Sequence, residues 1–346
     1  MGRVTLKQIA LDIGLSTFAV SRALAGKDGV STQTRALVGE AATRLGYIHP
    51  AAATREIGLV FYDLDHLNTE LHMQIQNGVQ REAHRLQRPV RVHWAHDFER
   101  IAELARASEG LLLVGPYDRA TIAQLKATQA PMVRLGWIEP LEQADQVVTT
   151  DREGGQAVIG YLAGLGHREI AYVMGSASYR GRRERFHGAR EMAEQIPGLA
   201  LHKMEFEEHG GFAGALCDLQ RRQIHPTAYF CANDGLALTV VSQLLGSGIR
   251  IPEDASVVGF GDFAAATQIS PALTTVRVEG GEIGAVALRL LLERIAQGRD
   301  ATAPARRIMI ASRIIERRST GPSPALHEAG HMRVDPPARE ASRIRS

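Results

Sequence analysis

The strongest constraint on the fold is a change of pattern at Ile57. Beyond it, short apolar runs alternate with longer amphipathic stretches, which is typical of strands and helices in a parallel sheet. Apolar runs occur at 57–61, 90–94, 110–114 and 132–135, and after a restart near residue 151 at 170–174, 201–206, 228–231 and 257–260. Single cores rarely grow beyond about 250–300 residues, so a chain of 346 residues should hold two α/β lobes besides a smaller N-terminal module.

The first fifty residues follow a helical rhythm instead. Apolar residues at helical spacing predict helices at 6–13 and 17–25, separated by a three-residue turn, and a third helix that ends near Gly46. Each is preceded by a hydroxyl residue that can cap its first turn: Thr5, Ser16, and Ser31 or Thr32. The sequence therefore predicts a compact three-helix module that contains a helix-turn-helix.

Composition limits the classes of protein to consider. With 45% hydrophobic and 23% charged residues, the chain is typical of a globular protein, and no apolar run is long enough to span a bilayer. The N-terminus has no secretory signal pattern and there are only two cysteines, Cys217 and Cys231, so we expect a cytoplasmic protein. The first fifty residues contain twice as many Lys and Arg as acids, which favours an anionic partner or simply forms a solvated helical surface.

Motifs along most of the chain resemble the lactose/galactose-repressor family. The N-terminal segment from Val4 to Ile48 is similar to the family's helix-turn-helix headpiece. The body carries, in the family's order, Asp151-Arg-Glu-Gly-Gly, Gly164-Leu-Gly-His, Arg185-Phe-His-Gly, Ala232-Asn-Asp and Pro271-Ala-Leu-Thr-Thr-Val. The resemblance implies an α-helical headpiece and an α/β periplasmic-binding-protein-like core of two lobes, each with a parallel sheet, joined by three crossovers.

The same resemblance divides the chain. It implies a DNA-binding headpiece at 1–49, a short hinge at 50–56 and an effector-binding and dimerisation core at 57–318. Within the core we expect lobe 1 at about 57–153 and 278–304, and lobe 2 at about 154–277 and 305–318. Residues 319–346 lack apolar periodicity and are expected to be disordered.

In helix-turn-helix proteins the second helix enters the major groove of DNA. This places four side chains against base edges: Thr17, Phe18, Ser21 and Arg22. Four hydroxyl residues can bind phosphates: Thr5, Ser16, Ser31 and Thr34. Arg22 is the strongest candidate for base recognition, as an Arg bidentate to guanine; the alternatives are a phosphate-binding Arg22 and a Phe18 that packs within the headpiece.

The hinge departs from the family pattern. No Leu lies between Tyr47 and Leu59, and the connector is several residues shorter than usual. The resemblance therefore does not extend to a leucine wedge in the minor groove.

The effector site is inferred by the same resemblance. Family motifs assign effector contacts in lobe 2 to Arg185, Asn233, Asp234 and Asp262, with Glu153 as a further candidate. Gly261 stands where the family has its first Asp of that loop. Residues after the first strand supply lobe 1 contacts: Asp63, Asn68 and Leu71. For Asn233 and Asp234 the alternative is a helix cap.

Together these features predict a transcriptional repressor of a carbohydrate-utilisation operon. Its partners are expected to be operator DNA, a small-molecule effector such as a sugar or sugar derivative, and a second copy of the chain. Apolar positions on helices 70–86 and 280–297 are the expected dimer surface. The alternatives are a regulator without a small-molecule effector and a sugar-binding protein of transport type.

Enzymatic and metal-binding functions find little support in the sequence. There is no Walker loop, no Gly-x-Ser-x-Gly and no Gly-x-Gly-x-x-Gly at the start of a helix. The four histidines that come close in sequence, His66, His72, His93 and His96, have no acid or Cys ligand at fixed spacing. We therefore expect no metal, no cofactor and no catalytic activity.

Overall fold

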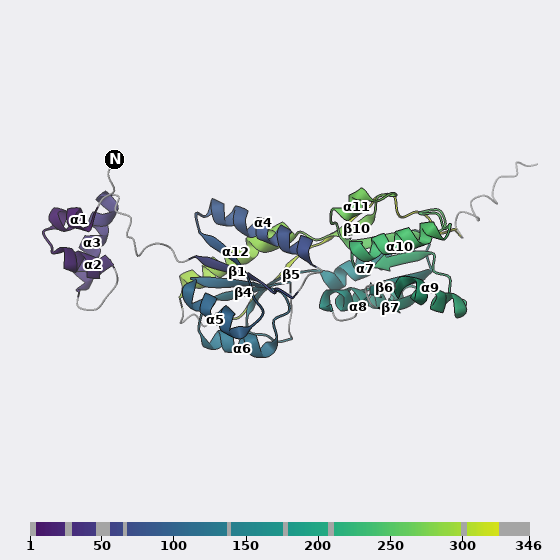
Figure 1. The fold of residues 1–346 in the computed structure, drawn as a ribbon, viewed down its shortest axis with the longest axis horizontal. Coiled ribbons are helices and arrows are strands. Elements are labelled where there is room, and N and C mark those ends of the chain that lie inside the picture. Colours follow the sequence, from purple (N-terminus) through teal and green to yellow (C-terminus); the bar gives the residue numbers. More distant parts are fainter. Residues whose placement is uncertain are drawn as a thin grey trace, which may run out of the picture.

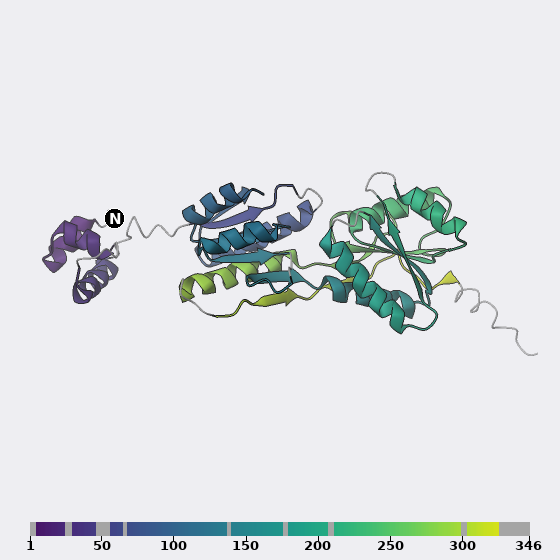
Figure 2. The ribbon, with the colours of Figure 1, turned by 90° about the horizontal axis from the view of Figure 1, so that it is seen from below.

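A computed structural model describes residues 5–24, 30–45, 56–64, 68–136, 140–175, 179–206, 211–298 and 303–324. The first two ranges form a three-helix headpiece, and the others form a core of two α/β lobes (Figure 1). Helices lie on both faces of each sheet, as the view from below makes clear (Figure 2). The hinge proposed at 50–56 lies outside the described residues apart from Glu56.

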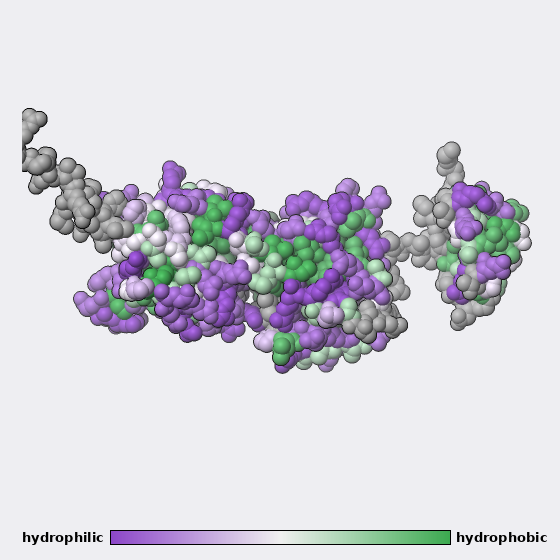
Figure 3. Space-filling model, turned by 180° about the vertical axis from the view of Figure 1, so that it is seen from behind, coloured by the Kyte–Doolittle hydropathy of each residue, from purple (hydrophilic) through white to green (hydrophobic). Residues whose placement is uncertain are grey.

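The headpiece consists of α1 (Leu6–Ile13), α2 (Thr17–Leu24) and α3 (Thr32–Leu45). The predicted caps are confirmed: Thr5 and Gln8 form a capping box, the Ser16 hydroxyl accepts from the amide of Ala19 at 3.1 Å, and Ser31 caps α3. The core is built from small and branched side chains: Ile9, Ala10, Val20, Ala23, Val38, Ala41 and Ala42. Apolar residues also form a patch on the headpiece surface (Figure 3).

Lobe 1 is an entirely parallel sheet in the order β11-β5-β4-β3-β1-β2. Its strands are β1 (Ile57–Phe61), β2 (Val90–Trp94), β3 (Gly110–Val114), β4 (Met132–Leu135), β5 (Asp145–Thr149) and β11 (Arg307–Ile310). On one face lie α4 (Thr69–Arg85) and α12 (Gly280–Gln297), and on the other α5 (Phe98–Ala107) and α6 (Arg119–Ala127) (Figure 1).

Lobe 2 repeats this plan in the order β12-β10-β9-β8-β6-β7, with only β12 antiparallel to its neighbour. Its strands are β6 (Glu169–Gly175), β7 (Ala200–Glu205), β8 (Ala228–Cys231), β9 (Ser256–Gly261), β10 (Thr274–Arg277) and β12 (Arg313–Ile315). Its helices are α7 (Asp151–Gly164), α8 (Arg180–Gln195), α9 (Gly211–Arg221), α10 (Asp234–Gly246) and α11 (Ala265–Gln268).

The chain passes between the lobes three times, from β5 to α7, from β10 to α12 and from β11 to β12. These crossovers are linked to one another. The amide of Ser312 donates to the Thr150 hydroxyl at 3.0 Å, and Arg313 lies 3.4 Å from the Glu279 carboxylate. The three crossovers are therefore hydrogen-bonded or ion-paired to one another and do not run independently between the lobes.

Three features differ from the sequence-based expectation. Strand β5 was not predicted, because it begins with the polar residues Asp145 and Gln146, although both are buried. Strand β11 pairs with β5, so 307–310 belongs to lobe 1 and not to lobe 2. Residues 319–324 were expected to be disordered, yet Ser319 is fully buried and its hydroxyl donates to the carbonyl of Val257 at 2.6 Å. The remaining tail, 325–346, lies outside the described residues.

Helices α4 and α12, on which the dimer surface is expected, expose fewer apolar side chains than their sequence pattern indicates. The two helices pack on each other so closely that a Cβ on Gly78 would lie 1.9 Å from the carbonyl oxygen of Gly281. Ile75, Val79 and Leu288 are buried in the core of lobe 1. Most apolar positions of these helices are therefore used within the lobe.

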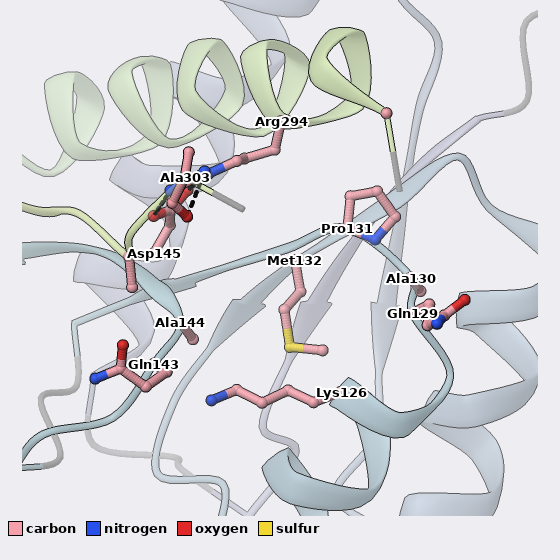
Figure 4. A pocket seen from close by; sticks show the side chains of 12 residues that line it. Lys126, Gln129, Ala130, Pro131, Met132, Gln143, Ala144, Asp145, Arg294 and Ala303 are labelled. Atoms are coloured by element: carbon pink, nitrogen blue, oxygen red, sulfur yellow. Dashed lines mark hydrogen bonds and ion pairs between the residues drawn. The ribbon is translucent and has the colours of Figure 1, made fainter. Parts of the chain in front are cut away.

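A buried ion pair fixes α12 and the start of β11 to β5. Asp145, 4% exposed, accepts from the Arg294 guanidinium at 2.5 and 2.8 Å and from the Arg306 amide at 2.7 Å (Figure 4). Burial alone would raise the pKa of Asp145, but the hydrogen bonds from Arg294 and Arg306 hold it below its usual value. The carboxylate is thus charged and tightly bound in the folded lobe.

We expect Arg294→Gln to lower the free energy of unfolding by about 3–5 kcal/mol, because it leaves the Asp145 charge buried without its partner. Urea unfolding followed by tryptophan fluorescence measures this. Arg100→Gln, which breaks an exposed pair with Glu103, is the control and should cost less than about 1 kcal/mol. Because the folded pKa of Asp145 lies below the unfolded value of about 3.9, the pair stabilises fully above that pH and loses its effect as pH falls through the folded pKa. Equal losses in the two variants would contradict this role.

Candidate functional site

A cavity of about 300 Å³ lies between the lobes, at the carboxyl ends of both sheets. Lobe 1 contributes residues that end or directly follow its strands: Tyr62, Val114, Gly115, Pro116, Leu135, Gly136 and Thr149. Lobe 2 contributes Asn233 after β8 and Phe260 and Gly261 at the end of β9. This is where open α/β folds bind ligands.

Arg185 is a polar group of the cavity that several contacts hold in place. Its Nε and Nη2 both lie 2.9 Å from Oδ1 of Asp151, and its Nη1 donates to the carbonyl of Ala232. The guanidinium carbon lies 3.8 Å from the ring centroid of Phe260, a cation–π contact. Arg185 is therefore held by α7, by β9 and by the residue that follows β8, all in lobe 2.

Two glycines in the predicted motifs explain how Arg185 reaches Asp151. A Cβ on Gly155 would lie 2.1 Å from the carbonyl oxygen of Arg185, and one on Gly188 would lie 1.9 Å from that of Arg152. Only glycine at both positions lets the backbones of α7 and α8 come this close. The close packing of α7 on α8 thus sets the Asp151–Arg185 pair.

The first turn of α8 supplies side chains that the sequence analysis did not single out. Arg180 and Arg182 line the cavity together with Tyr179. Arg182 is 3% exposed, lies 4.7 Å from the Tyr179 ring centroid and donates to the carbonyl of Met174 at 3.2 Å. The family motif used in the sequence analysis begins at Arg185, five residues after the start of α8, so it did not include them.

Four of the eight predicted effector residues line the cavity: Asn68, Leu71, Arg185 and Asn233. Asn233 also caps α10, because its side-chain oxygen accepts from the amide of Leu236 at 2.8 Å. The cap that was the alternative reading of Asn233 is therefore present, and it holds the residue at the cavity wall.

The other four lie elsewhere. Asp234 is fully buried beneath the cavity, where it accepts from the Thr275 hydroxyl at 2.6 Å and the Phe263 amide at 2.8 Å. Burial raises the pKa of Asp234. Since Phe263 lines the cavity, Asp234 positions this loop from below and does not face the cavity itself.

Asp262 points away from the cavity because two arginines hold it. Its oxygens accept from Arg277 and Arg317, each at 2.5 Å. Burial would raise the pKa of Asp262, but these hydrogen bonds keep it below the usual value. Asp63 binds His96 at 2.8 Å, and Glu153 lies exposed on α7. None of these three carboxylates is among the residues that line the cavity.

One hydrogen bond crosses directly between the lobes beside the cavity. Glu70, in the first turn of α4, accepts from the backbone amide of Ala264 at 2.7 Å. Ala264 follows β9 and precedes α11 in lobe 2. The contact exists only while the lobes are this close.

We expect Glu70→Ala to weaken binding of a ligand between the lobes by about 2–10-fold, because one hydrogen bond of the closed arrangement is lost. Glu70→Gln, which keeps an acceptor oxygen, should recover most of the affinity. Calorimetric titration measures both, with the exposed α5 residue Glu99→Ala as the control. Wild-type affinity in Glu70→Ala would show that this bond does not favour closure.

The headpiece presents the predicted DNA-contacting residues on one helix and at three helix starts. Phe18 is 71% exposed, so the packing alternative for this residue is wrong. The Arg22 guanidinium lies 5.6 Å from the Phe18 ring centroid. Val20 and Ala23 face the headpiece core, which leaves Thr17, Phe18, Ser21 and Arg22 on the other side of α2.

The four predicted phosphate-binding hydroxyls all take part in helix starts. Thr5, Ser16 and Ser31 accept from amides of the first turns, and the Thr34 hydroxyl lies 2.8 Å from that of Ser31. A hydroxyl that accepts one hydrogen bond can still donate another, and helix N-termini attract phosphates. Their use as caps is therefore compatible with a role at the DNA backbone.

Of the histidines considered as metal ligands, His66 lies outside the described residues, and the others do not lie together in one site. His72 is buried against Phe61, with ring centroids 5.1 Å apart, and His96 pairs with Asp63. Across the described residues, no group of three or more His, Cys, Asp or Glu side chains could hold a metal ion. Within the same residues, no helix has the length and apolar character needed to cross a membrane.

Comparison with known proteins gives the family. The model of the bacterial regulatory proteins of the lacI family matches residues 5–50, and that of a periplasmic binding protein-like domain matches residues 159–320. The HTH-type transcriptional repressor PurR of Vibrio cholerae serotype O1 (strain M66-2) is 30% identical over 315 residues, which cover 84% of this chain and 91% of that protein. The chain belongs to the lacI family. It is a DNA-binding transcriptional regulator with a helix-turn-helix and a periplasmic-binding-protein-like core.

Solved structures of lacI-family proteins share the whole architecture. The transcriptional regulator CelR in complex with cellobiose is 26% identical and has a TM-score of 0.66, covering 92% of this chain and 100% of that one. The lac repressor dimer bound to operator and the anti-inducer ONPF is 25% identical, with the same TM-score and coverage. The expected fold class is thus confirmed, with β12 as the antiparallel exception in lobe 2.

Proposed function

We propose that this lacI-family chain is a homodimeric repressor whose operator affinity is changed by a small molecule bound between its lobes. The observation that carries the proposal is the cavity at the lobe interface, which both lobes line. A ligand there contacts both lobes and so favours one arrangement of them over another. Only such differential affinity can shift a conformational equilibrium.

The chemistry of the cavity supports a sugar derivative as effector. Arg185 and Asn233 offer planar hydrogen-bonding groups, while Tyr62 and Phe263 offer aromatic surface. Aromatic faces with a few fixed polar groups suit small polyhydroxylated rings. We propose that Asn68, Leu71, Arg185 and Asn233 contact the effector, and that Asp234 supports the site from below.

A dimer is supported by the paired half-sites that helix-turn-helix proteins read. On lobe 1, Trp94 of edge strand β2 is 51% exposed and its ring lies 6.1 Å from that of His72 on α4, next to Met73, which is 57% exposed. These side chains are available for a partner. We propose that the chain acts in the cytoplasm, where the operator lies, and that it binds its effector without catalysing a reaction on it.

The test begins with selection of the operator from random duplexes by the full-length protein. We expect a pseudo-palindrome of about 14–20 base pairs, bound with an affinity that falls steeply between 50 and 200 mM salt as phosphate contacts release counterions. Fluorescence anisotropy, repeated with a panel of sugars, sugar acids, sugar phosphates and purines, then identifies compounds that change this affinity.

The outcomes separate the alternatives. A dimer by sedimentation, a specific operator and at least one compound that alters operator affinity support the proposal. Specific operator binding that no small molecule changes would favour a regulator without such an effector. A monomer at micromolar concentration, or equal affinity for all duplexes, would contradict the proposed repressor.

A further inference from the structure

We infer that the effector of this regulator is a small anion, a sugar acid or sugar phosphate, whose negative group binds at the first turn of α8. The inference rests on the proposed effector function and narrows it to a chemical class. It arises from the distribution of charge and hydrogen-bond donors in the cavity, which is strongly one-sided.

The described residues that line the cavity include three arginines and one carboxylate. Arg180, Arg182 and Arg185 all line the cavity, whereas Asp151 is the only acidic residue among the described lining residues. Both oxygens of Asp151 are already engaged, Oδ1 by Arg185 at 2.9 Å and Oδ2 by the Thr149 hydroxyl at 2.7 Å. The carboxylate therefore orients Arg185 and offers little acceptor capacity to a ligand hydroxyl.

Two of the guanidinium groups are arranged with a face against an aromatic ring. The Arg182 Cζ lies 4.7 Å from the Tyr179 centroid, and the Arg185 Cζ lies 3.8 Å from the Phe260 centroid. Stacking uses the face of a guanidinium, while its hydrogen bonds are made from the edge in a planar fork that matches carboxylate and phosphate oxygens. Asp151 already takes the Nε/Nη2 edge of Arg185, so the anion uses the N–H groups that remain on the three arginines, which suit an anion better than a neutral hydroxyl.

The backbone of α8 adds positive potential at the same place. Its N-cap, Tyr179, makes no side-chain hydrogen bond to the first turn, and that turn contains no acidic residue. Tyr179, Arg180, Gly181 and Arg182 all line the cavity, so the amino end of this helix borders it. A Cβ on Gly181 would lie 3.3 Å from the Arg185 guanidinium. A glycine at this position therefore leaves room for the guanidinium beside the first turn of α8. The amino end of a helix attracts negative groups.

The rest of the cavity limits the body of the ligand. A volume of about 300 Å³ is at the lower end of small-molecule sites. Tyr62, Leu71 and Phe263 line the same cavity from elements other than α8 and provide apolar surface. A monosaccharide-sized ring with one acidic substituent satisfies both parts of the cavity.

The experiment measures thermal unfolding of the full-length protein with matched pairs: D-glucose against D-gluconate and D-glucose 6-phosphate, and D-ribose against D-ribose 5-phosphate. Inorganic phosphate is the minimal probe, with sodium chloride at equal ionic strength as its control. We expect the anionic member of each pair to raise Tm more, and millimolar phosphate to raise Tm about 2 °C or more above chloride. The gluconate and phosphate arms tell a carboxylate site from a phosphate site.

Variants locate the effect. Arg182→Gln and Arg180→Gln should remove the preference for anions, each compared with its own ligand-free Tm. Arg182 is buried, so its substitution can impair folding. Arg180 is partly exposed, so Arg180→Gln is expected to fold and still tests the anion preference. Arg190→Gln, on the same helix but paired at the surface with Glu194, is the matched control and should keep the preference.

Results that would refute the anionic effector can be told apart from those that would refute the proposed function. The inference is overturned where phosphate stabilises no more than chloride, where neutral sugars stabilise more than their anionic partners, or where Arg180→Gln and Arg182→Gln both keep the full anion preference. A neutral compound that changes operator affinity while anions do not would leave the proposed repressor intact and refute only the anionic class. Operator affinity that no compound changes would refute the proposed effector function itself.

Discussion

Arg185→Ala is expected to weaken effector binding by about 10–150-fold, the loss typical of a hydrogen bond to a charged group. The structure holds this guanidinium in place with Asp151, the Ala232 carbonyl and the face of Phe260. The measurement is calorimetric titration of the compound that most changes operator affinity. Operator binding without effector should stay close to wild type, because the headpiece is a separate unit.

Two further variants sharpen this result. Arg185→Lys keeps the charge but not the planar fork, so it should recover only part of the affinity. Arg183→Ala removes an exposed arginine of the same helix that does not line the cavity, and should bind normally. Unchanged affinity in Arg185→Ala would show that the effector binds elsewhere.

The second large effect is expected at the DNA. Arg22→Ala should reduce the ratio of operator to non-specific affinity by about 5–150-fold, because a bidentate contact to guanine discriminates by about 1–3 kcal/mol. Arg22 lies beside the exposed ring of Phe18 on the outer side of α2. Anisotropy with the selected operator and a scrambled duplex, at two salt concentrations, measures the ratio.

Arg44→Ala is the control for charge. This arginine lies on α3 and pairs with Asp12, so its loss removes one positive charge from the headpiece without touching α2. The ratio of operator to non-specific affinity in Arg44→Ala should stay near the wild-type value. If Arg22→Ala instead weakens both duplexes equally, Arg22 binds a phosphate and the base-recognition assignment is wrong.

The sequence predicted most elements because their periodicity reflects burial on one face. It failed at β5, where Asp145 and Gln146 are buried polar residues. Asp145 pairs with Arg294 on the distant helix α12, and Gln146 donates to the nearby Glu142. It also assigned β11 to the wrong lobe. The local sequence of β11 does not indicate which sheet it joins, because its pairing with β5 depends on the tertiary structure.

The site could be predicted only in part, because the partners of buried polar side chains also depend on tertiary structure. Motifs identified Arg185 on α8 and Asn233 just after β8, but the acids were assigned by motif and position without knowledge of their partners. The carboxyl oxygens of Asp234 and Asp262 accept hydrogen bonds from Thr275, Arg277 and Arg317, and only the structure shows these partners. Tyr62 could have been found, because it directly follows β1 at the carboxyl end of the sheet.

The three linked crossovers have a consequence for recombination between relatives. Neither lobe is a continuous piece of chain, since lobe 1 needs β11 and α12 from beyond lobe 2. A chimera that exchanges one lobe must therefore be joined at three places, near Thr150, Val278 and Ala311, whereas the headpiece can be exchanged with a single junction. DNA specificity can thus be transferred between such regulators in one step, while effector specificity changes more readily by substitution inside the cavity.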